Sequence, residues 1–463
     1  MDITPALLNL TTEWRDWASQ PNIDPAEQRS VALRKFFDCV EDKNSSLDLS
    51  DLSLTSLPTI PEWVIELDVS DNQLTNLPNN LPKALTHLYV GQNQLTSLPE
   101  YLPEELLALR ANANKLTALS DHLPKNLMSL NISENQIISL PSELPANLRL
   151  LNVGDNKLSA LPDNLPSSLG VLFVDKNNLE SLPNKLPNSL WYLKVSDNPL
   201  TALPNQLPSM LQTLEVKNAF LTALPNSLPD TLWNLKVSNN QITALPAKLP
   251  LNLQVLKIDK NKLSVLPNQL PEELRELNVA SNQLTNLTEV LPSKLSILAA
   301  SHNQLKKLPQ ILPNTLRTLL VDDNQLTFLP LDLPSELTNL NVYCNQLKFL
   351  PDKLPPKLTI LDVGDNRLKF LPDNLPVKLE QLYVNRNQLT KLPDHLPNSL
   401  IVLHASFNKL NLIANNLPNS LEHLFIAGNQ LTSLSIDLPP GIIKLDVKRN
   451  QLTALPELPN GIT

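Results

Sequence analysis

One pattern of leucine, asparagine and proline positions runs through nearly the whole chain. It follows L-x-x-L-x-V-x-x-N-x-L-T-x-L-P-x-x-L-P-x-x, as in "LTHLYVGQNQLTSLPEYLPEE" from Leu85. The asparagine position recurs every 21 residues from Asn72 to Asn450, in nineteen copies of which only Ala219 departs. A shorter copy begins at Leu47, which makes about twenty repeats. Self-similarity at such a period predicts a solenoid in which each repeat forms one coil.

The alternation around each L-x-V run predicts one short strand per coil. Counting back from each asparagine (N), the apolar positions N−5 and N−3 are expected to point inward. Positions N−6, N−4 and N−2 are expected to point outward on a concave side. An asparagine amide both donates and accepts hydrogen bonds, so it can satisfy the backbone of a buried turn. At Ala219 we therefore expect a weaker turn, with Asn218 as the candidate replacement.

The L-P-x-x-L-P segment is expected to form the opposite side of each coil. Proline fixes φ and has no N–H donor, so two prolines in each repeat favour an extended path over a helix. The 42 prolines and only 7 glycines of the chain agree with this structural use of proline. The whole pattern is the leucine-rich-repeat signature. It predicts a leucine-rich-repeat solenoid over residues 46–463, with parallel strands on the concave face and an extended proline-rich convex side.

A segment of different character precedes the repeats. A short helix is predicted to begin at Thr11 or Thr12, and a second helix to run from Pro25 to about Asp42. Because the end of a solenoid exposes its leucine core, residues 11–45 are expected to form an α-helical cap of two helices. A separate binding role for these helices is the alternative.

Charge, cysteines and hydropathy narrow the class of protein. The net charge of −9 and the pI near 5.3 disfavour a nucleic-acid partner. Some fourteen repeats, about 4.8 Å apart, separate Cys39 from Cys344, which is far beyond the reach of a disulfide of about 7 Å. We therefore expect reduced thiols. The first residues lack the pattern of a cleaved secretory signal, and no apolar run is long enough to span a membrane.

The sequence contains none of the usual catalytic motifs. It has no phosphate-binding glycine loop, C-x-x-C pair or H-E-x-x-H motif, so we expect no enzyme activity and no cofactor. The strongest metal candidate is His404 with His423 and Asp446. Because these histidines occupy different positions of their strands, they are expected to be surface residues, and no metal site is predicted.

Function is therefore expected on the outward strand positions, where two apolar groups are candidate partner-binding surfaces. The first group is Leu150, Val171, Phe173 and Tyr192. The second group is Ile360, Tyr383, Val402, His404 and Phe425. Neighbouring strands lie about 4.8 Å apart, so Tyr383, His404 and Phe425 are expected to form a contiguous row. The alternative is that a long sheet exposes some apolar surface by accident.

A band of charged residues lies between these groups. It comprises Lys194, Glu215, Lys217, Lys236, Lys257 and Lys260. Such a band can be a functional surface, or its lysines can pair with glutamates across the strands. The sequence leaves both interpretations open.

The cap and repeats together resemble one protein family. The W-x-x-W motif at Trp14, the "EQR" at Glu27 and the "DC" at Asp38, followed by "LDLS" and L-P repeats, are similar to the LPX-repeat effectors of bacterial type III secretion. These are the YopM-like and IpaH-type proteins, and the resemblance covers residues 11–459. It implies an export signal in a disordered segment at residues 1–10, delivery into host cells and binding of host proteins. The host cytoplasm is the expected compartment, with the nucleus as an alternative.

Several functional alternatives accompany this resemblance. IpaH-type members carry a ubiquitin-ligase domain with a catalytic cysteine in a C-x-D motif, and neither Cys39 nor Cys344 lies in such a motif. We therefore expect a non-enzymatic scaffold for host proteins. The second hypothesis is the substrate-recognition half of a ubiquitin-ligase system whose catalytic domain is missing or separate. A surface adhesin is the third, and self-association stays open.

Overall fold

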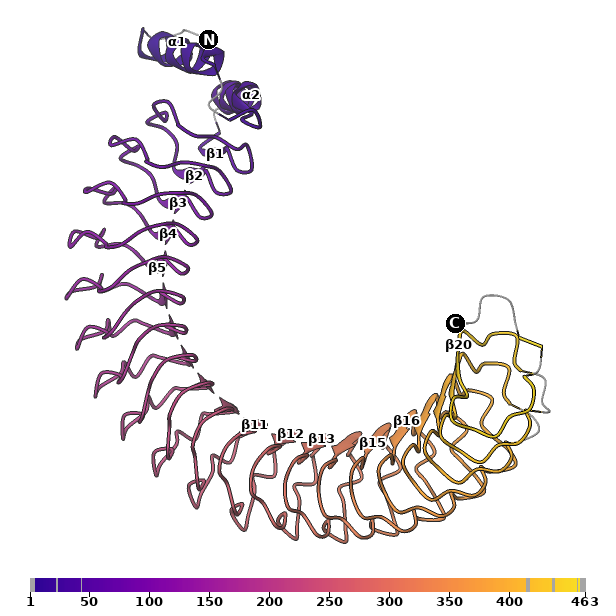
Figure 1. Cartoon of the computed structure of the whole chain (residues 1–463). Coiled ribbons are helices and arrows are strands. Elements are labelled where there is room, and N and C mark those ends of the chain that lie inside the picture. The colour runs from indigo at the N-terminus through magenta and orange to yellow at the C-terminus, as the bar shows by residue number, and fades with distance from the viewer. Residues whose placement is uncertain are drawn as a thin grey trace. The chain divides into compact units, whose positions relative to one another are not determined.

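The computed structural model describes residues 5–21, 24–42, 44–413, 417–434, 438–455 and 457–458. The chain divides into two compact units, the first ending at residue 221 and also containing residues 227–232. The second comprises residues 222–226 and the chain from residue 233 onward. The first unit begins with two helices, and both units consist of leucine-rich-repeat coils (Figure 1). None of the described helices is long and apolar enough to cross a membrane.

The first helix, α1 (Pro5–Ser19), begins earlier than predicted. Residues 5–10, expected within a disordered segment, are helical, and residues 1–4 lie outside the described residues. Thr11 and Thr12 do not cap the helix, because both hydroxyls donate to the Leu8 carbonyl at 2.9 Å. Threonine commonly makes this bond inside a helix. Proline is favoured in the first helical turn, where its missing N–H is not needed.

The second helix, α2 (Arg29–Glu41), begins four residues later than the predicted start at Pro25. The preceding residues form a turn around Asp24. The carboxylate of Asp24 accepts from the Ala26 N–H at 2.7 Å, and its carbonyl accepts from the Glu27 N–H at 3.0 Å. Aspartate side chains often bond the backbone two residues on, which favours a turn over a helix.

The two helices pack on each other and on the first repeats through aromatic and ionic contacts. Trp14 is fully buried and stacks on Phe36, with ring centroids 4.2 Å apart. A buried ion pair joins Arg29 Nε to Glu27 Oε1 at 3.1 Å, and the same carboxylate oxygen accepts from the Thr55 N–H at 2.9 Å. The helices therefore cap the first coils, as the sequence predicted.

Each coil contributes one three-residue strand, and the strands pair in parallel. The first unit holds β1 (Ser46–Asp48), β2 (Glu66–Asp68), β3 (His87–Tyr89), β4 (Ala108–Arg110), β5 (Ser129–Asn131), β6 (Leu150–Asn152), β7 (Val171–Phe173), β8 (Tyr192–Lys194) and β9 (Thr213–Glu215). The second unit holds β10 (Asn234–Lys236), β11 (Val255–Lys257), β12 (Glu276–Asn278), β13 (Ile297–Ala299), β14 (Thr318–Leu320), β15 (Asn339–Asn341), β16 (Ile360–Asp362), β17 (Gln381–Tyr383), β18 (Val402–His404), β19 (His423–Phe425) and β20 (Lys444–Asp446). This confirms the predicted fold.

The leucine pattern decides which side chains are buried. In β18, Leu403 and the following Ala405 are fully buried at positions N−5 and N−3, whereas Val402 and His404 on either side of Leu403 are half-buried. Most other coils repeat this arrangement, although Thr213 and Glu215 in β9 and Asn234 in β10 are buried. Positions N−6 and N−4 therefore form one outward surface in each unit. We call this surface the strand face. Within each unit it lines the inner side of the stacked coils, and the proline segments line the outer side (Figure 1).

The predicted asparagine ladder is present. Asn198 shows its bonds: the side-chain Oδ1 accepts from the Leu179 N–H at 2.9 Å, and Nδ2 donates to the carbonyls of Val174 and Val195 at 2.9 and 3.1 Å. These bonds join a coil to the one before it and close its own turn. The ladder asparagines from Asn72 to Asn429 are buried, so each satisfies backbone groups that water cannot reach.

Ala219 interrupts this ladder, and restoring the amide provides a test. Ala219 is 6% exposed, and its neighbour Asn218 donates to Asp197 Oδ1 at 2.7 Å. An asparagine at 219 would offer Nδ2 to the Val195 carbonyl and Oδ1 to the Leu200 N–H, following the pattern of Asn198.

We expect Ala219→Asn to raise the free energy of unfolding by about 1 kcal/mol, which is typical of one or two net hydrogen bonds. The reverse change in an intact coil, Asn177→Ala, is expected to lower it by about 1–3 kcal/mol. Urea unfolding followed by circular dichroism measures both variants. An unchanged or lower midpoint for Ala219→Asn would show that this coil already satisfies its backbone in another way.

Candidate functional site

The predicted aromatic row is present on the strand face of the second unit. Parallel pairing places Tyr383 beside His404 and His404 beside Phe425. The ring centroids of Tyr383 and His404 are 6.3 Å apart, and those of His404 and Phe425 are 5.3 Å apart, both with edge-on geometry. Aromatic rings at these separations attract each other, so the row is an ordered surface. We call Tyr383, His404 and Phe425 the aromatic row.

A carboxylate lies at each end of the aromatic row. The same strand register places Asp362 beside Tyr383, and Asp446 beside Phe425. Burial raises the pKa of the Asp362 carboxyl above its ordinary value. Burial and the charge of Asp362 also raise the pKa of the Tyr383 hydroxyl. The row therefore offers three half-buried rings between two acidic groups.

His404 belongs to this row as an aromatic ring rather than as a cation. Burial lowers the pKa of its imidazole below the usual value, and the nearby charge of Asp446 acts in the opposite direction. The imidazole is therefore neutral at neutral pH. A neutral ring between Tyr383 and Phe425 costs less to desolvate than an imidazolium would, so a partner can cover it.

The remaining members of the second predicted group do not form a continuous column. Ile360 pairs with Gln381, and Gln381 pairs with Val402, so a polar residue separates the two aliphatic side chains. Val402 pairs on its other side with His423, whose ring stacks on Phe425 at 6.3 Å. His423 thus extends the aromatic surface, while Ile360 lies apart from it. His423 was not among the partner-binding residues predicted from the sequence.

The first predicted group lies in the first unit and is less apolar than its sequence suggested. Leu150, Val171 and Tyr192 are neighbours in one column, and the ring of Phe173 meets that of Tyr192 edge-on at 4.9 Å. Polar groups surround these rings: the Tyr192 hydroxyl lies 3.3 Å from Glu215 Oε1.

Phe173 and Tyr192 also line a shallow pocket of about 570 Å³ together with charged residues. Among them, Lys194 Nζ lies 2.9 Å from Asp175 Oδ2, and Lys176 Nζ lies 3.1 Å from Asp155 Oδ2. The group is therefore a mixed surface in which two aromatic rings border ion pairs.

The lysine band contains several ion pairs, which favours the second interpretation left open by the sequence. Lys194 pairs with Asp175, as above, and Lys217 Nζ lies 3.8 Å from Glu215 Oε2. In the second unit, Lys257 Nζ lies 2.8 Å from Glu276 Oε1. These pairs lower the net positive charge that the band presents to an acidic partner.

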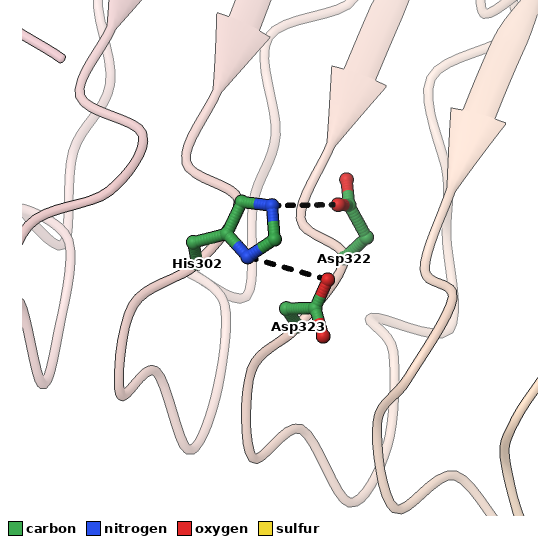
Figure 2. A group of neighbouring side chains, drawn as sticks. All are labelled: His302, Asp322 and Asp323. Atoms are coloured by element: carbon green, nitrogen blue, oxygen red, sulfur yellow. Dashed lines mark ion pairs between the residues drawn. The ribbon is translucent and has the colours of Figure 1, made fainter. Parts of the chain in front are cut away.

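Among the described residues, one group of titratable side chains could hold a metal ion, and it differs from the candidate considered in the sequence. It consists of His302, Asp322 and Asp323, in the turns that follow β13 and β14 (Figure 2). His404 and His423, the histidines of the earlier candidate, instead contact Phe425 as aromatic rings. Cys39 and Cys344 are both free thiols.

Comparison with known proteins places this geometry among bacterial effectors. The structure is similar to YopM from Yersinia enterocolitica WA-314, with 38% identity, a TM-score of 0.91, and coverage of 99% of this chain and 98% of that chain. It is also similar to the leucine-rich effector protein YopM from Yersinia pestis, with 34% identity, a TM-score of 0.68, and coverage of 78% of this chain and 99% of that chain.

Sequence comparison adds a second kind of relative. The E3 ubiquitin-protein ligase ipaH7.8 of Shigella flexneri is 36% identical over 66 residues, which is 14% of this chain. The chain spans only 11% of the length of that protein, so the match covers a small part of the ligase. No family model matches the chain.

Proposed function

Because the chain belongs to the YopM-like family of leucine-rich-repeat effector proteins, we propose that it is a secreted bacterial virulence effector that binds host proteins. It acts as a scaffold without catalysis, through the strand face. The host cytoplasm is its place of action, with the nucleus as the alternative compartment. No nucleic acid is involved.

The observation that carries this proposal is the aromatic row. Exposed apolar surface on a rigid sheet often marks an interaction site, and aromatic side chains supply much of the binding energy at protein interfaces. Tyr383, His404 and Phe425 are held in register by parallel pairing of β17, β18 and β19, so little side-chain freedom is lost when a partner covers them.

Charge indicates the kind of partner segment that would fit. The carboxylates of Asp362 and Asp446 end the row, so a segment with apolar side chains in the middle and Lys or Arg at both ends would complement it. The guanidinium of Arg386, a nearby cation, instead lies over the Phe407 ring, 5.1 Å from the ring centroid. The first unit's Phe173 and Tyr192 are a second candidate contact.

Capture from host-cell lysate tests the proposal with the full chain. His404→Glu places a carboxylate between the rings of Tyr383 and Phe425 and is expected to reduce the captured partner at least about tenfold, because the partner would have to desolvate this charge. The matched control is His395→Glu, which adds the same charge at an exposed histidine in a proline segment. Equal capture by the wild type and His404→Glu would remove the aromatic row from the proposal.

The match to a ubiquitin ligase favours one second candidate function, a substrate-recognition module that works with a separate catalytic domain. Incubation of the purified chain with ubiquitin, activating enzyme and conjugating enzyme tests for transfer. The scaffold proposal expects none with the chain alone. Transfer that appears only when a protein bearing a C-x-D cysteine is added would support the recognition module instead.

A further inference from the structure

The turns after β13 and β14 bring together side chains of different chemistry on two neighbouring coils of the second unit. His302 and Asp323 each directly precede a ladder asparagine and have positive φ angles of 52° and 48°. The His302 N–H donates to the Asp322 carbonyl at 2.9 Å, which holds the two turns against each other. The backbone of the coils therefore fixes the relative positions of the three side chains.

Both carboxylates face the imidazole of His302 (Figure 2). His302 Nδ1 lies 3.3 Å from Asp323 Oδ2, and His302 Nε2 lies 3.9 Å from Asp322 Oδ2. One ligand atom from each residue can be chosen so that all three lie within 4.8 Å of one another. Two ligands of one Zn²⁺ ion are at most about 4.2 Å apart, twice the usual metal–ligand distance of about 2.1 Å. Small side-chain rotations would close this difference, and His302 is 59% exposed and has room to rotate.

Groups outside the trio hold both carboxylates in place. Asp322 Oδ1 accepts from the Ser301 hydroxyl and, at 3.1 Å, from Asn341 Nδ2, so the other oxygen of Asp322 is directed toward His302. The Cys344 thiol donates a hydrogen bond to the Asp323 carboxylate. Such outer contacts orient metal ligands and strengthen binding.

From this geometry we propose that His302, Asp322 and Asp323 bind a divalent transition metal ion of the zinc class. One imidazole nitrogen and two carboxylate oxygens are three of the four ligands that Zn²⁺ takes in a tetrahedral site. The fourth position is left for water or for a side chain of a bound partner. The imidazole favours Zn²⁺, Co²⁺ or Ni²⁺ over Ca²⁺ or Mg²⁺, which prefer six or more oxygen ligands.

The simpler arrangement is an imidazole that makes polar contacts with both carboxylates and binds no metal. The two arrangements make opposite predictions when a metal ion is added. A metal-binding protein takes up one ion per chain, whereas a site that only makes polar contacts takes up none.

Titration of the untagged full chain with Co²⁺ and Zn²⁺, followed by calorimetry and by the visible absorption of Co²⁺, tests the proposal. We expect one ion per chain and a Co²⁺ spectrum typical of low coordination number. His302→Ala should weaken binding by more than about 100-fold, since removal of even an outer contact costs about 10–100-fold. His395→Ala, which removes an exposed histidine elsewhere, should leave the affinity unchanged.

Three further variants separate a designed site from a chance contact. Asn341→Ala and Cys344→Ala remove the outer contacts to Asp322 and Asp323 and should each weaken binding about 10–100-fold, whereas Cys344→Ser keeps a donor and should restore it. Thermal unfolding without metal checks that all variants fold. Absence of binding by the wild type, or equal affinity of the wild type and His302→Ala, would overturn the proposal.

Discussion

Replacement of Trp14 by alanine is expected to lower the free energy of unfolding of the amino-terminal cap by about 3–5 kcal/mol. The indole is fully buried, and it stacks on Phe36 and meets Trp17 edge-on at 5.7 Å. Its Nε1 also donates to the Thr59 carbonyl at 2.9 Å. The variant therefore loses a large apolar contact and leaves the Thr59 carbonyl without this donor.

Hydrogen exchange measured by mass spectrometry resolves this effect along the chain. Protection should fall in α1, α2 and the first repeats, because their contacts meet at Trp14, and it should fall less in later coils, because each coil contacts only its neighbours. Trp191→Ala is the matched control, since that indole is 43% exposed. Unchanged exchange in the cap of Trp14→Ala would show that the cap does not depend on this aromatic contact.

The second large effect concerns the affinity of the proposed interaction with a host protein. Each of Tyr383 and Phe425 is expected to contribute about 2 kcal/mol or more, which corresponds to roughly 30-fold in Kd. The double variant Tyr383→Ala with Phe425→Ala should therefore weaken binding about 100- to 1000-fold. The range is wide because the effects of two substitutions in one interface do not simply add. Calorimetric titration of the purified partner measures the change.

A control pair of two exposed aromatic residues is present in the chain. Phe349 and Phe370 are 45% and 57% exposed and lie outside the strands. Phe349→Ala with Phe370→Ala should leave the Kd within about threefold of the wild type, an effect below 1 kcal/mol. If this pair weakens binding and the Tyr383 and Phe425 pair does not, the partner binds another surface.

The repeat period explains why the coils could be predicted and the cap boundaries could not. In a repeat, every copy places its leucines and asparagine in the same surroundings, so nineteen copies support one assignment. The cap occurs once, and side-chain contacts that are distant in sequence decide its boundaries. Glu27 bonds Thr55, and the residues from Asp24 to Glu27 form a turn rather than the start of α2.

Of the two candidate sites, the repeat pattern predicted the aromatic row but not the group of His302, Asp322 and Asp323. The row could be predicted because Tyr383, His404 and Phe425 occupy one repeat position on the outward face. The other group was missed because the outward positions were taken as N−6, N−4 and N−2, whereas His302 and Asp323 lie at N−1. The left-handed turn at N−1 brings these side chains together, and His and Asp at one position of adjacent repeats was the available signal.

The ladder of asparagines also affects how the gene of a repeat protein can gain or lose length. Asn198 bonds the coil before it as well as its own, and Asn324 repeats the same bonds with Ala300 and Val321 at 3.0 and 3.1 Å. Recombination that adds or removes a whole repeat joins two coils through bonds of the same kind, so the core is kept and the outward residues are recombined. Loss of a single codon shifts every later position within that coil. Selection on this protein can therefore vary its strand face in steps of one repeat.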